Sequence, residues 1–264
     1  MASSSSAKKA AEQTGNGVEG MAGLAKGLAI IEAFGPRRTQ MTVTDAANIT
    51  GMWPATARRC LLTLQDLGYL SHDGKFYRPT PRMVRLGAAY LETASLPVLA
   101  QPHVTAARDE LGESVSVAVL EGDSVVFVAR AEVQRLVTAA VRLGAQLPAH
   151  ASASGRVLLA ALPDPELDAR LAGCEPVQTT PRTLLTAGDI RKRVEQARRA
   201  GYSLTDEELE MGIRTLAVPI QDSAGRTQAA MSVSTLAARV SLEELDERFL
   251  PVLQNHAARL GRQL

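Results

Sequence analysis

The fold is decided by one stretch, MTVTDAANITGMWPATARRCLLTLQDLGYL, residues 41–70. It predicts two short helices joined by a tight turn. Thr42 is a favoured N-cap, and Asp45 three positions later completes the pattern of a capping box. Gly51 ends the first helix because glycine accepts the left-handed backbone of a C-cap. Pro54 opens the second helix at a position that needs no N–H donor, so the stretch predicts a helix-turn-helix.

The second helix of this pair has one buried and one exposed face. Its apolar stripe recurs at intervals of three and four residues, at Ala57, Cys60, Leu61 and Leu64. The opposite face combines small residues with arginines, which suits entry into a DNA major groove. The residues of the two helices and the turn that we expect to contact DNA are Thr44, Trp53, Ala55, Thr56, Arg58, Arg59 and Thr63. The alternative is an ordinary helical hairpin with a solvated basic face, since such patterns are short.

A small hairpin after the second helix favours the DNA-binding interpretation. Residues 72–75, His-Asp-Gly-Lys, are a turn signal between two short strands. A helix-turn-helix followed directly by a hairpin is a winged helix. On this wing, Lys75, Tyr77 and Arg78 are expected to reach phosphates beside the groove.

Two more helices flank the helix-turn-helix. A helix that packs under it is predicted from the spacing of four apolar residues, Leu24, Leu28, Ile31 and Phe34. Arg37 and Arg38 follow in a loop that either touches the DNA backbone or is solvated. A linker helix over residues 80–94, capped by Thr80, carries a second stripe, Met83, Leu86, Tyr90 and Leu91. Because a lone helix cannot bury such a stripe against itself, we expect it to pack on a second copy of the chain.

Length and composition bound the class of protein. The chain has 264 residues, enough for two domains, and no apolar run approaches the ~20 residues that a membrane span requires. Residues 1–20 lack the apolar core of a secretory signal and are expected to form a flexible tail. Cys60 and Cys174 are isolated, as expected of reduced thiols in a cytoplasmic protein.

Charge is distributed unevenly along the chain. Residues 1–96 hold 11 of the 29 Lys and Arg and 7 of the 28 Asp and Glu, a net charge of +4, and the remainder carries −3. The positive part contains the helix-turn-helix and the wing, and its sign is the one that phosphate contacts require.

The second half predicts an α+β domain with an antiparallel sheet. The expected strands are residues 113–120, 124–130, 136–143, 213–221 and 227–235. The expected helices are residues 98–111, 155–161, 165–171 and 188–200, and a final helix capped by Ser241. The predicted organisation is a tail (1–20), a winged helix-turn-helix (21–80), a linker helix (81–96) and a second domain (97–264).

Three stretches in this order resemble the IclR family of bacterial transcriptional regulators: residues 41–70, residues 147–160 (LPAHASASGRVLLA) and residues 201–235 (GYSLTDEELEMGIRTLAVPIQDSAGRTQAAMSVST). The third looks closest to the branch that governs protocatechuate, 4-hydroxybenzoate and β-ketoadipate catabolism. The resemblance implies a GAF-like effector-binding domain, operator binding by a dimer or a tetramer, and control by a small organic acid. It leaves open the operator, the effector, and whether transcription is repressed or activated.

The resemblance also implies effector-binding positions, which are Ala153, Ser154, Thr205, Asp206, Thr215, Ser232 and Ser234. Ser232 and Ser234 are two apart on a strand and so share a face, which is a polar pocket wall or a solvated surface. Hydroxyls and N–H groups at a helix start near Ser154 suit a carboxylate. Family members that bind small keto acids carry an acid and a cysteine at the positions of Thr205 and Thr215. This difference favours an aromatic or dicarboxylic acid, with a glyoxylate- or pyruvate-type effector as the alternative.

Charged residues near these positions have separate expected roles. The acidic run contains Asp206, Glu207, Glu208 and Glu210, and apart from Asp206 it is expected to be a solvated turn. Arg214 is one residue out of phase with Thr215 and is predicted to point away from the effector. Arg142 and His150 flank the loop before residue 153, where they either pair with an acid or lie at the surface.

A catalytic interpretation finds little support in the sequence. The four histidines show no metal-ligand spacing, and the run Ser152 to Gly155 is no nucleophile elbow, which needs glycine two residues before the serine. No phosphate loop or dinucleotide fingerprint is present, so we expect no catalytic residue, metal or cofactor. An enzyme domain fused to a DNA-binding module is a remote alternative. A purely architectural DNA binder would not need a second domain of this size.

Overall fold

The computed structural model describes residues 21–35, 38–133 and 141–264. The chain divides into two compact units, Met1–Ala89 and Tyr90–Leu264, with the division inside helix α5 (Val84–Thr93). The expected tail (1–20), Arg37 and most of the expected strand 136–143 lie outside the described residues. None of the described helices is long and apolar enough to cross a membrane.

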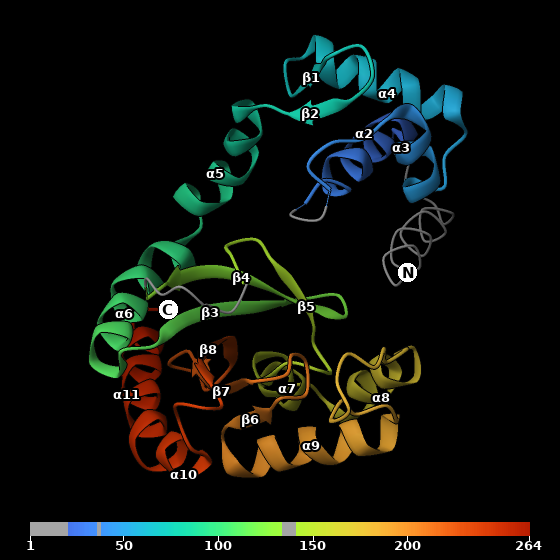
Figure 1. Ribbon diagram of the computed structural model, residues 1–264. Coiled ribbons are helices and arrows are strands. Elements are labelled where there is room, and N and C mark those ends of the chain that lie inside the picture. Colours follow the sequence, from blue (N-terminus) through green and yellow to red (C-terminus); the bar gives the residue numbers. More distant parts are fainter. Residues whose placement is uncertain (1–20, 36–37, 134–140) are drawn as a thin grey trace. The chain divides into compact units, whose positions relative to one another are not determined.

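The first unit packs helices and a two-stranded wing around one apolar core (Figure 1). Its elements are α2 (Ala22–Glu32), α3 (Val43–Thr50), α4 (Pro54–Asp66), β1 (Leu70–His72) and β2 (Tyr77–Pro79). The wing strands are antiparallel, with Leu70 opposite Pro79 and His72 opposite Tyr77. The architecture of this unit is the predicted winged helix-turn-helix.

The predicted caps of the helix-turn-helix are confirmed. The Asp45 N–H donates to Thr42 Oγ1 at 3.2 Å, and the Thr42 N–H donates to Asp45 Oδ2 at 2.9 Å, which is a capping box. Gly51 ends α3 in the left-handed region at φ 67°, and Pro54 opens α4. Ala57, Leu61 and Leu64 form the buried face of α4, whereas Cys60 is half-buried at its edge.

Within one chain, each of the two predicted apolar stripes is buried only in part. In α2 the buried residue is Ile30, while Leu24 and Leu28 are 62% and 45% exposed, because only the C-terminal part of this helix packs on the core. Beyond the wing, a 3-10 turn η2 (Pro81–Met83) leads into α5, and Met83 packs on the first unit's core. The other linker residues of the stripe, Leu86, Tyr90 and Leu91, are exposed.

The second unit is built on an antiparallel sheet with the strand order β5-β4-β3-β8-β7-β6. The strands are β3 (Ser114–Glu121), β4 (Ser124–Ala131), β5 (Gln146–Pro148), β6 (Ser203–Asp206), β7 (Ile213–Gln221) and β8 (Thr227–Leu236). The short edge strands β5 and β6 were not predicted, because three or four residues are too few to show an alternating pattern. The fold class is α+β, as predicted.

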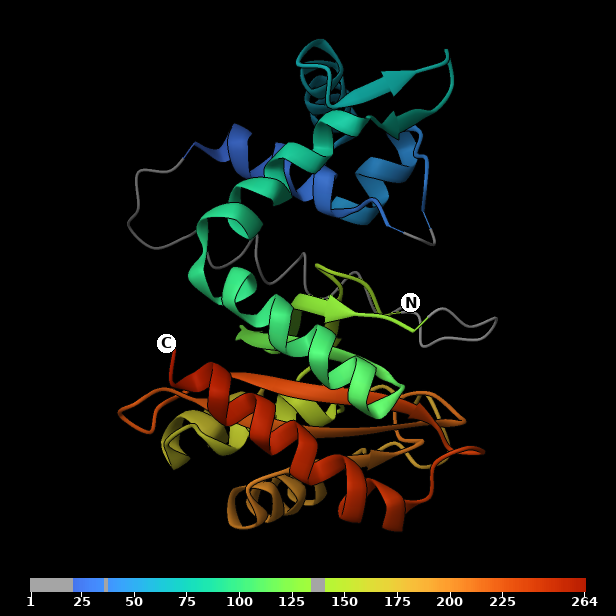
Figure 2. The same ribbon diagram turned by 90° about the vertical axis from the view of Figure 1, so that its left-hand side faces the viewer.

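Helices cover both faces of this sheet (Figures 1 and 2). One face packs on α6 (Ser95–Leu111) and α11 (Leu250–Gly261), which also contact each other. The other packs on α7 (Ala153–Ala160), with α8 (Asp164–Ala172) and α9 (Ala187–Ala200) beyond it. A short helix α10 (Leu242–Glu244) and a π-helical turn η3 (Leu245–Phe249) precede α11, and Ser241 caps α10 as predicted.

The side chains of β8 alternate between these two faces. Met231 and Val233 join the core under α6 and α11, and Ala230 joins the core under α7. Ser232 and Ser234 have the parity of Ala230, so they face α7. The prediction of one apolar and one polar face on this strand is confirmed.

Candidate functional site

The residues expected to contact DNA lie on the exposed face of α4, in the turn before it and at the start of α3. The side chains of Thr44, Ala55, Arg58, Arg59 and Thr63 are exposed, and Thr56 is half-buried. Trp53, in the turn directly before α4, is 82% exposed. The Thr63 hydroxyl donates to the carbonyl of Arg59 at 3.0 Å, one helical turn earlier. This face therefore offers small side chains, hydroxyls and two guanidinium groups to a partner.

The wing presents two cations, one of which is held in place. Lys75 is exposed, whereas Arg78 donates from Nη1 to Asp73 Oδ2 at 2.5 Å and from Nη2 to Gln40 Oε1 at 2.7 Å. The pKa of Asp73 lies well below its usual range, because the backbone N–H groups of Phe76 and Lys75 and then Arg78 stabilise its carboxylate. Asp73 therefore stabilises the turn of the wing by accepting hydrogen bonds from the N–H groups of Lys75 and Phe76 and from Arg78.

The prediction that Tyr77 contacts phosphate is wrong. Its side chain is 3% exposed, belongs to the core of the first unit and stacks on His72 with ring centroids 4.2 Å apart. Residues alternate sides along a strand, so Tyr77 faces inward where its neighbours Phe76 and Arg78 do not.

In the second unit, hydroxyl side chains gather on the sheet face that α7 covers. One row of cross-strand neighbours joins Ser234 on β8, Thr215 on β7 and Thr205 on β6. The hydroxyls of Thr215 and Ser234 are 3.3 Å apart. Ser232 lies in the next row, opposite Ser116 of β3. Thr205 and Ser232 are buried, whereas Thr215 and Ser234 are half-buried, so this polar surface is largely interior.

Arg130 of β4 completes the second row. The sequence analysis did not predict a role for this residue. It lies opposite Ser116, and its Nη1 donates to the Ser116 hydroxyl at 2.7 Å. Its Nε donates to Glu132 Oε1 at 2.7 Å. The side chain is 3% exposed, and Nη2 is buried with no hydrogen-bond partner among the described residues. A cation inside the apolar strand SVVFVARA is the signal that could have revealed it.

The first turn of α7 borders the same face. Ala153 and Ser154 are buried, and the Ser152 hydroxyl caps the helix by accepting from the Gly155 N–H at 3.1 Å. A Cβ atom on Gly155 would lie 2.1 Å from the carbonyl oxygen of Ala149, so only glycine lets the preceding loop approach so closely. The helix start is therefore fixed beside the polar sheet face.

Comparison with known proteins identifies the family. A model of the IclR helix-turn-helix domain matches residues 23–74, and a model of the C-terminal part of bacterial transcriptional regulator IclR matches residues 88–262. The chain belongs to the IclR family. Members of this family are transcriptional regulators, so the chain is a DNA-binding regulator and not an enzyme.

Three relatives in the IclR family cover most of the chain. The Pca regulon regulatory protein of Pseudomonas putida is 40% identical over 92% of this chain and 84% of its own length. The p-hydroxybenzoate hydroxylase transcriptional activator of Acinetobacter baylyi is 35% identical over 91% of this chain and 90% of its own. A solved structure shows an IclR homologue of Microbacterium hydrocarbonoxydans complexed with 4-hydroxybenzoate. Its sequence is 27% identical to this chain, and the TM-score is 0.74. The match covers 91% of this chain and 98% of the homologue.

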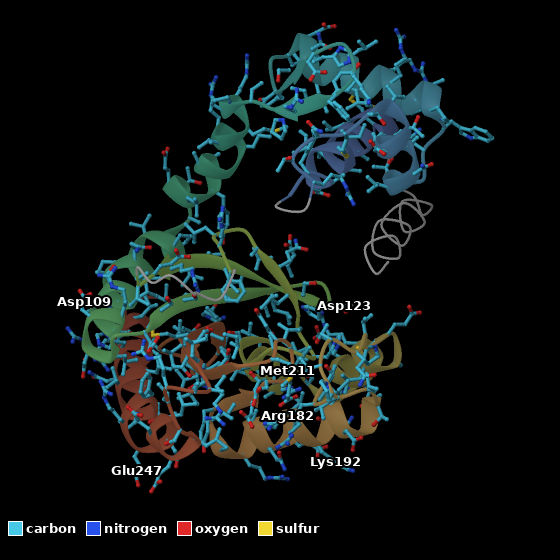
Figure 3. All side chains as sticks on the ribbon, viewed as in Figure 1. Asp109, Asp123, Arg182, Lys192, Met211 and Glu247 are labelled. Carbon is cyan, nitrogen blue, oxygen red and sulfur yellow. The ribbon has the colours of Figure 1, made fainter. Side chains whose placement is uncertain are left out.

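The structure corrects the predicted place of Asp206. Thr205 pairs with Thr215, and Asp206 with Arg214, so the second pair lies on the opposite sheet face. Arg214 Nε donates to Asp206 Oδ1 at 2.5 Å, and Asp206 also pairs with Arg182, which Figure 3 labels. Arg214 points away from Thr215, as predicted. Asp206 forms an ion pair with Arg214 on that opposite face, so it does not face the hydroxyl cluster.

Arg142 and His150, which flank the loop before α7, also have defined positions. Arg142 is exposed, which agrees with the surface alternative. His150 is half-buried, and burial, reinforced by the Arg156 cation, holds the pKa of its imidazole below the usual value, although Asp123 opposes this. His150 is therefore held toward the neutral form. No group of three potential metal ligands that could hold an ion is present among the described residues.

Glu208, expected in a solvated turn, is instead buried against Arg156 of α7. The guanidinium donates from Nη1 and Nη2 to the two carboxylate oxygens at 3.1 and 2.6 Å. The Arg156 side chain is 1% exposed and that of Glu208 is 9% exposed. A third bond, from Arg156 Nε to the His150 carbonyl at 3.0 Å, completes the site. The pair therefore joins α7, the loop before it and the loop after β6.

Breaking this pair is expected to destabilise the second unit. Arg156→Met leaves a buried carboxylate without its cation, which should lower the free energy of unfolding by about 3–5 kcal/mol. Arg156→Met with Glu208→Met should recover most of this loss, because it removes both charges. The measurement is urea denaturation followed by circular dichroism.

Arg248→Met is the matched control, since Arg248 pairs with Glu244 on an exposed helix surface. It should cost less than about 1 kcal/mol. A double variant as unstable as Arg156→Met alone would show that the arginine stabilises the unit by something other than its pairing with Glu208.

Proposed function

We propose that this protein regulates genes of aromatic-acid catabolism in the cytoplasm, and that it binds a small organic acid on the polar sheet face beneath α7. The printed names of its relatives support this: one regulates the Pca regulon, and another activates p-hydroxybenzoate hydroxylase transcription. A structural neighbour was crystallised with 4-hydroxybenzoate. The proposed effector is an aromatic or dicarboxylic acid of the β-ketoadipate route.

The observation that carries the proposal is Nη2 of Arg130, which is buried and has no hydrogen-bond partner within residues 21–35, 38–133 and 141–264. A buried donor without an acceptor is unfavourable, and a buried charged one is more so. A carboxylate would accept from this group in a charge-assisted bond. Ser232, Ser234 and Thr215 then supply hydroxyl donors from neighbouring strands.

The surroundings of Arg130 also suit an aromatic ring. Phe127, Ala118 and Val157 belong to the apolar cluster on the α7 face of the sheet. A ligand with one charged end and one flat apolar end matches a cation beside such a surface. A keto acid as small as glyoxylate would use the cation but not the apolar part.

For DNA, we propose that α4 enters the major groove of double-stranded operator DNA. The proposed contacts are Thr44, Trp53, Ala55, Thr56, Arg58, Arg59 and Thr63, with Lys75 and Arg78 on the wing, and Tyr77 removed because it is buried. Arg78 is already bonded to Asp73 and Gln40, whereas the exposed Lys75 has its ammonium nitrogen 4.9 Å from the centroid of the Phe76 ring.

We also propose that the protein acts as a homodimer or a dimer of dimers. Leu24 and Leu28 on α2, and Leu86, Tyr90 and Leu91 on α5, expose apolar side chains that the described residues of one chain do not cover. Such faces are expected to pack on another protein surface. Two linked helix-turn-helix units would then read two half-sites together.

The effector proposal predicts that Arg130→Gln weakens effector binding at least tenfold, because a hydrogen bond to a charged oxygen contributes about 1.5–3 kcal/mol. Ser232→Ala with Ser234→Ala should also weaken it at least tenfold, and operator affinity without effector should not change. A thermal-shift screen of protocatechuate, 4-hydroxybenzoate, β-ketoadipate, glyoxylate and pyruvate selects the ligand, and titration calorimetry measures the affinities.

Arg142→Gln, which removes an exposed arginine, is the control and should bind as the wild type does. Equal affinities for the wild type, Arg130→Gln and the serine double variant would place the effector elsewhere. If only glyoxylate or pyruvate raises the melting temperature of the protein, the effector is a small keto acid and not an aromatic acid.

The DNA proposal predicts that Arg59→Ala weakens operator binding. A base contact should cost about 1–3 kcal/mol and relax specificity at one position, whereas a phosphate contact should weaken all sequences alike and reduce the salt slope by about one. Fluorescence anisotropy on a duplex selected from a random library, at several salt concentrations, measures both. Arg85→Ala, an exposed arginine on α5, is the control. If Arg59→Ala binds the operator with the wild-type affinity, Arg59 does not contact DNA.

The assembly proposal predicts that Leu86→Asp with Tyr90→Asp shifts the protein toward the monomer and abolishes tight operator binding, because two half-sites are no longer linked. Sedimentation velocity gives the oligomeric state. Arg85→Asp places a carboxylate on the same helix outside the apolar stripe and should leave the state unchanged. An unchanged oligomer in the double variant would exclude α5 from the interface.

A further inference from the structure

Trp53 is the single tryptophan of the chain, and 82% of its surface is exposed. Tryptophan is normally among the largely buried residues, since its ring is the largest apolar group a protein has. Among the described residues, the ring of Trp53 has no aromatic, cation–π or hydrogen-bonding partner. The residues that the structure describes therefore leave this ring available to a binding partner.

The helix start does not require this side chain. Trp53 is the N-cap of α4, and its carbonyl oxygen accepts from the N–H groups of Thr56 and Ala57 at 2.9 and 3.0 Å. Any residue supplies that carbonyl. The indole ring makes no capping hydrogen bond, whereas serine, threonine or aspartate would provide one. Local stability therefore favours another residue here.

The position of Trp53 indicates what the ring contacts. In a helix-turn-helix, the N-terminal residues of the second helix meet base edges in the major groove. Trp53 precedes that helix directly, Ala55 beside it is small and exposed, and Arg58 and Arg59 follow on the exposed side. The ring thus lies at the groove end of α4, among residues that suit DNA.

In the major groove, the apolar group that distinguishes one base from the others is the C5-methyl of thymine. We propose that Trp53 packs on a thymine methyl group and so selects thymine at one position of each half-site. This inference rests on the proposed role of α4 as the recognition helix. Trp53 would then recognise the shape and apolar surface of a base, whereas the arginines of α4 would contact hydrogen-bond acceptors of bases or phosphate groups.

The test replaces thymine by deoxyuridine, which removes only the methyl group, one position at a time in a duplex selected by the wild-type protein. At one position per half-site, the wild type should lose about fourfold in affinity, the change that burial of one methyl group produces. Trp53→Ser should bind more weakly and lose this sensitivity while keeping sensitivity elsewhere. Because serine supplies an N-cap hydroxyl, loss of the helix start would not explain the result.

Two further measurements complete the test. The emission of the single tryptophan should change on adding the selected duplex and not on diluting the protein. Leu67→Ala, at the other end of α4 and 50% exposed in the wild type, is the matched control and should keep the wild-type deoxyuridine profile.

Three outcomes would overturn the inference. If the wild type binds its duplex but Trp53→Ser keeps the full deoxyuridine profile, the methyl contact is absent and the proposed function stands. If emission changes on dilution and not with DNA, the ring packs on a second copy of the chain. If the wild type selects no duplex at all, the recognition role of α4 fails together with the inference.

Discussion

The second unit depends on the buried ion pair between Arg156 and Glu208. Two buried charges are costly unless every hydrogen-bonding group is satisfied. Here the guanidinium donates to both carboxylate oxygens and to the His150 carbonyl, and the Glu208 carbonyl in turn accepts from the hydroxyls of Thr180 and Thr183. One interaction therefore fixes the start of α7, the loop before it and the loop after β6. Breaking it would release three segments that border the proposed effector surface.

With α7 held in this way, the sheet has two unlike faces. The face under α6 and α11 is an apolar core, and the face under α7 carries hydroxyls beside an apolar cluster. Arg130 adds one buried cation to it, and one nitrogen of this cation has no hydrogen-bond partner in the described part of the chain. We propose that such a surface orients an acid, which agrees with membership in a family of regulators.

The first unit distributes its side chains differently, since its core is small and its exposed surfaces carry the residues proposed to contact DNA. Tight local geometry supports them: a capping box starts α3, glycine ends it and proline opens α4. The face of α4 and the apolar sides of α2 and α5 remain uncovered by the described chain. Partners complete these surfaces, and we propose DNA for the first and a second copy of the chain for the others.

The sequence by itself determined what nearby residues decide. The caps at Thr42 and Gly51, the wing turn, and the shared face of Ser232 and Ser234 all follow from signals within a few positions, and the motifs indicated the family. Only the tertiary structure decided which side chains meet across the fold. Glu208 looked solvated, yet its partner Arg156 lies 52 residues earlier, and Arg130 meets Ser116 across a strand pair. Tyr77 was misassigned and Ile30 was missed because the burial of a side chain depends on the elements that pack over it, and periodicity within one short segment does not show which elements those are.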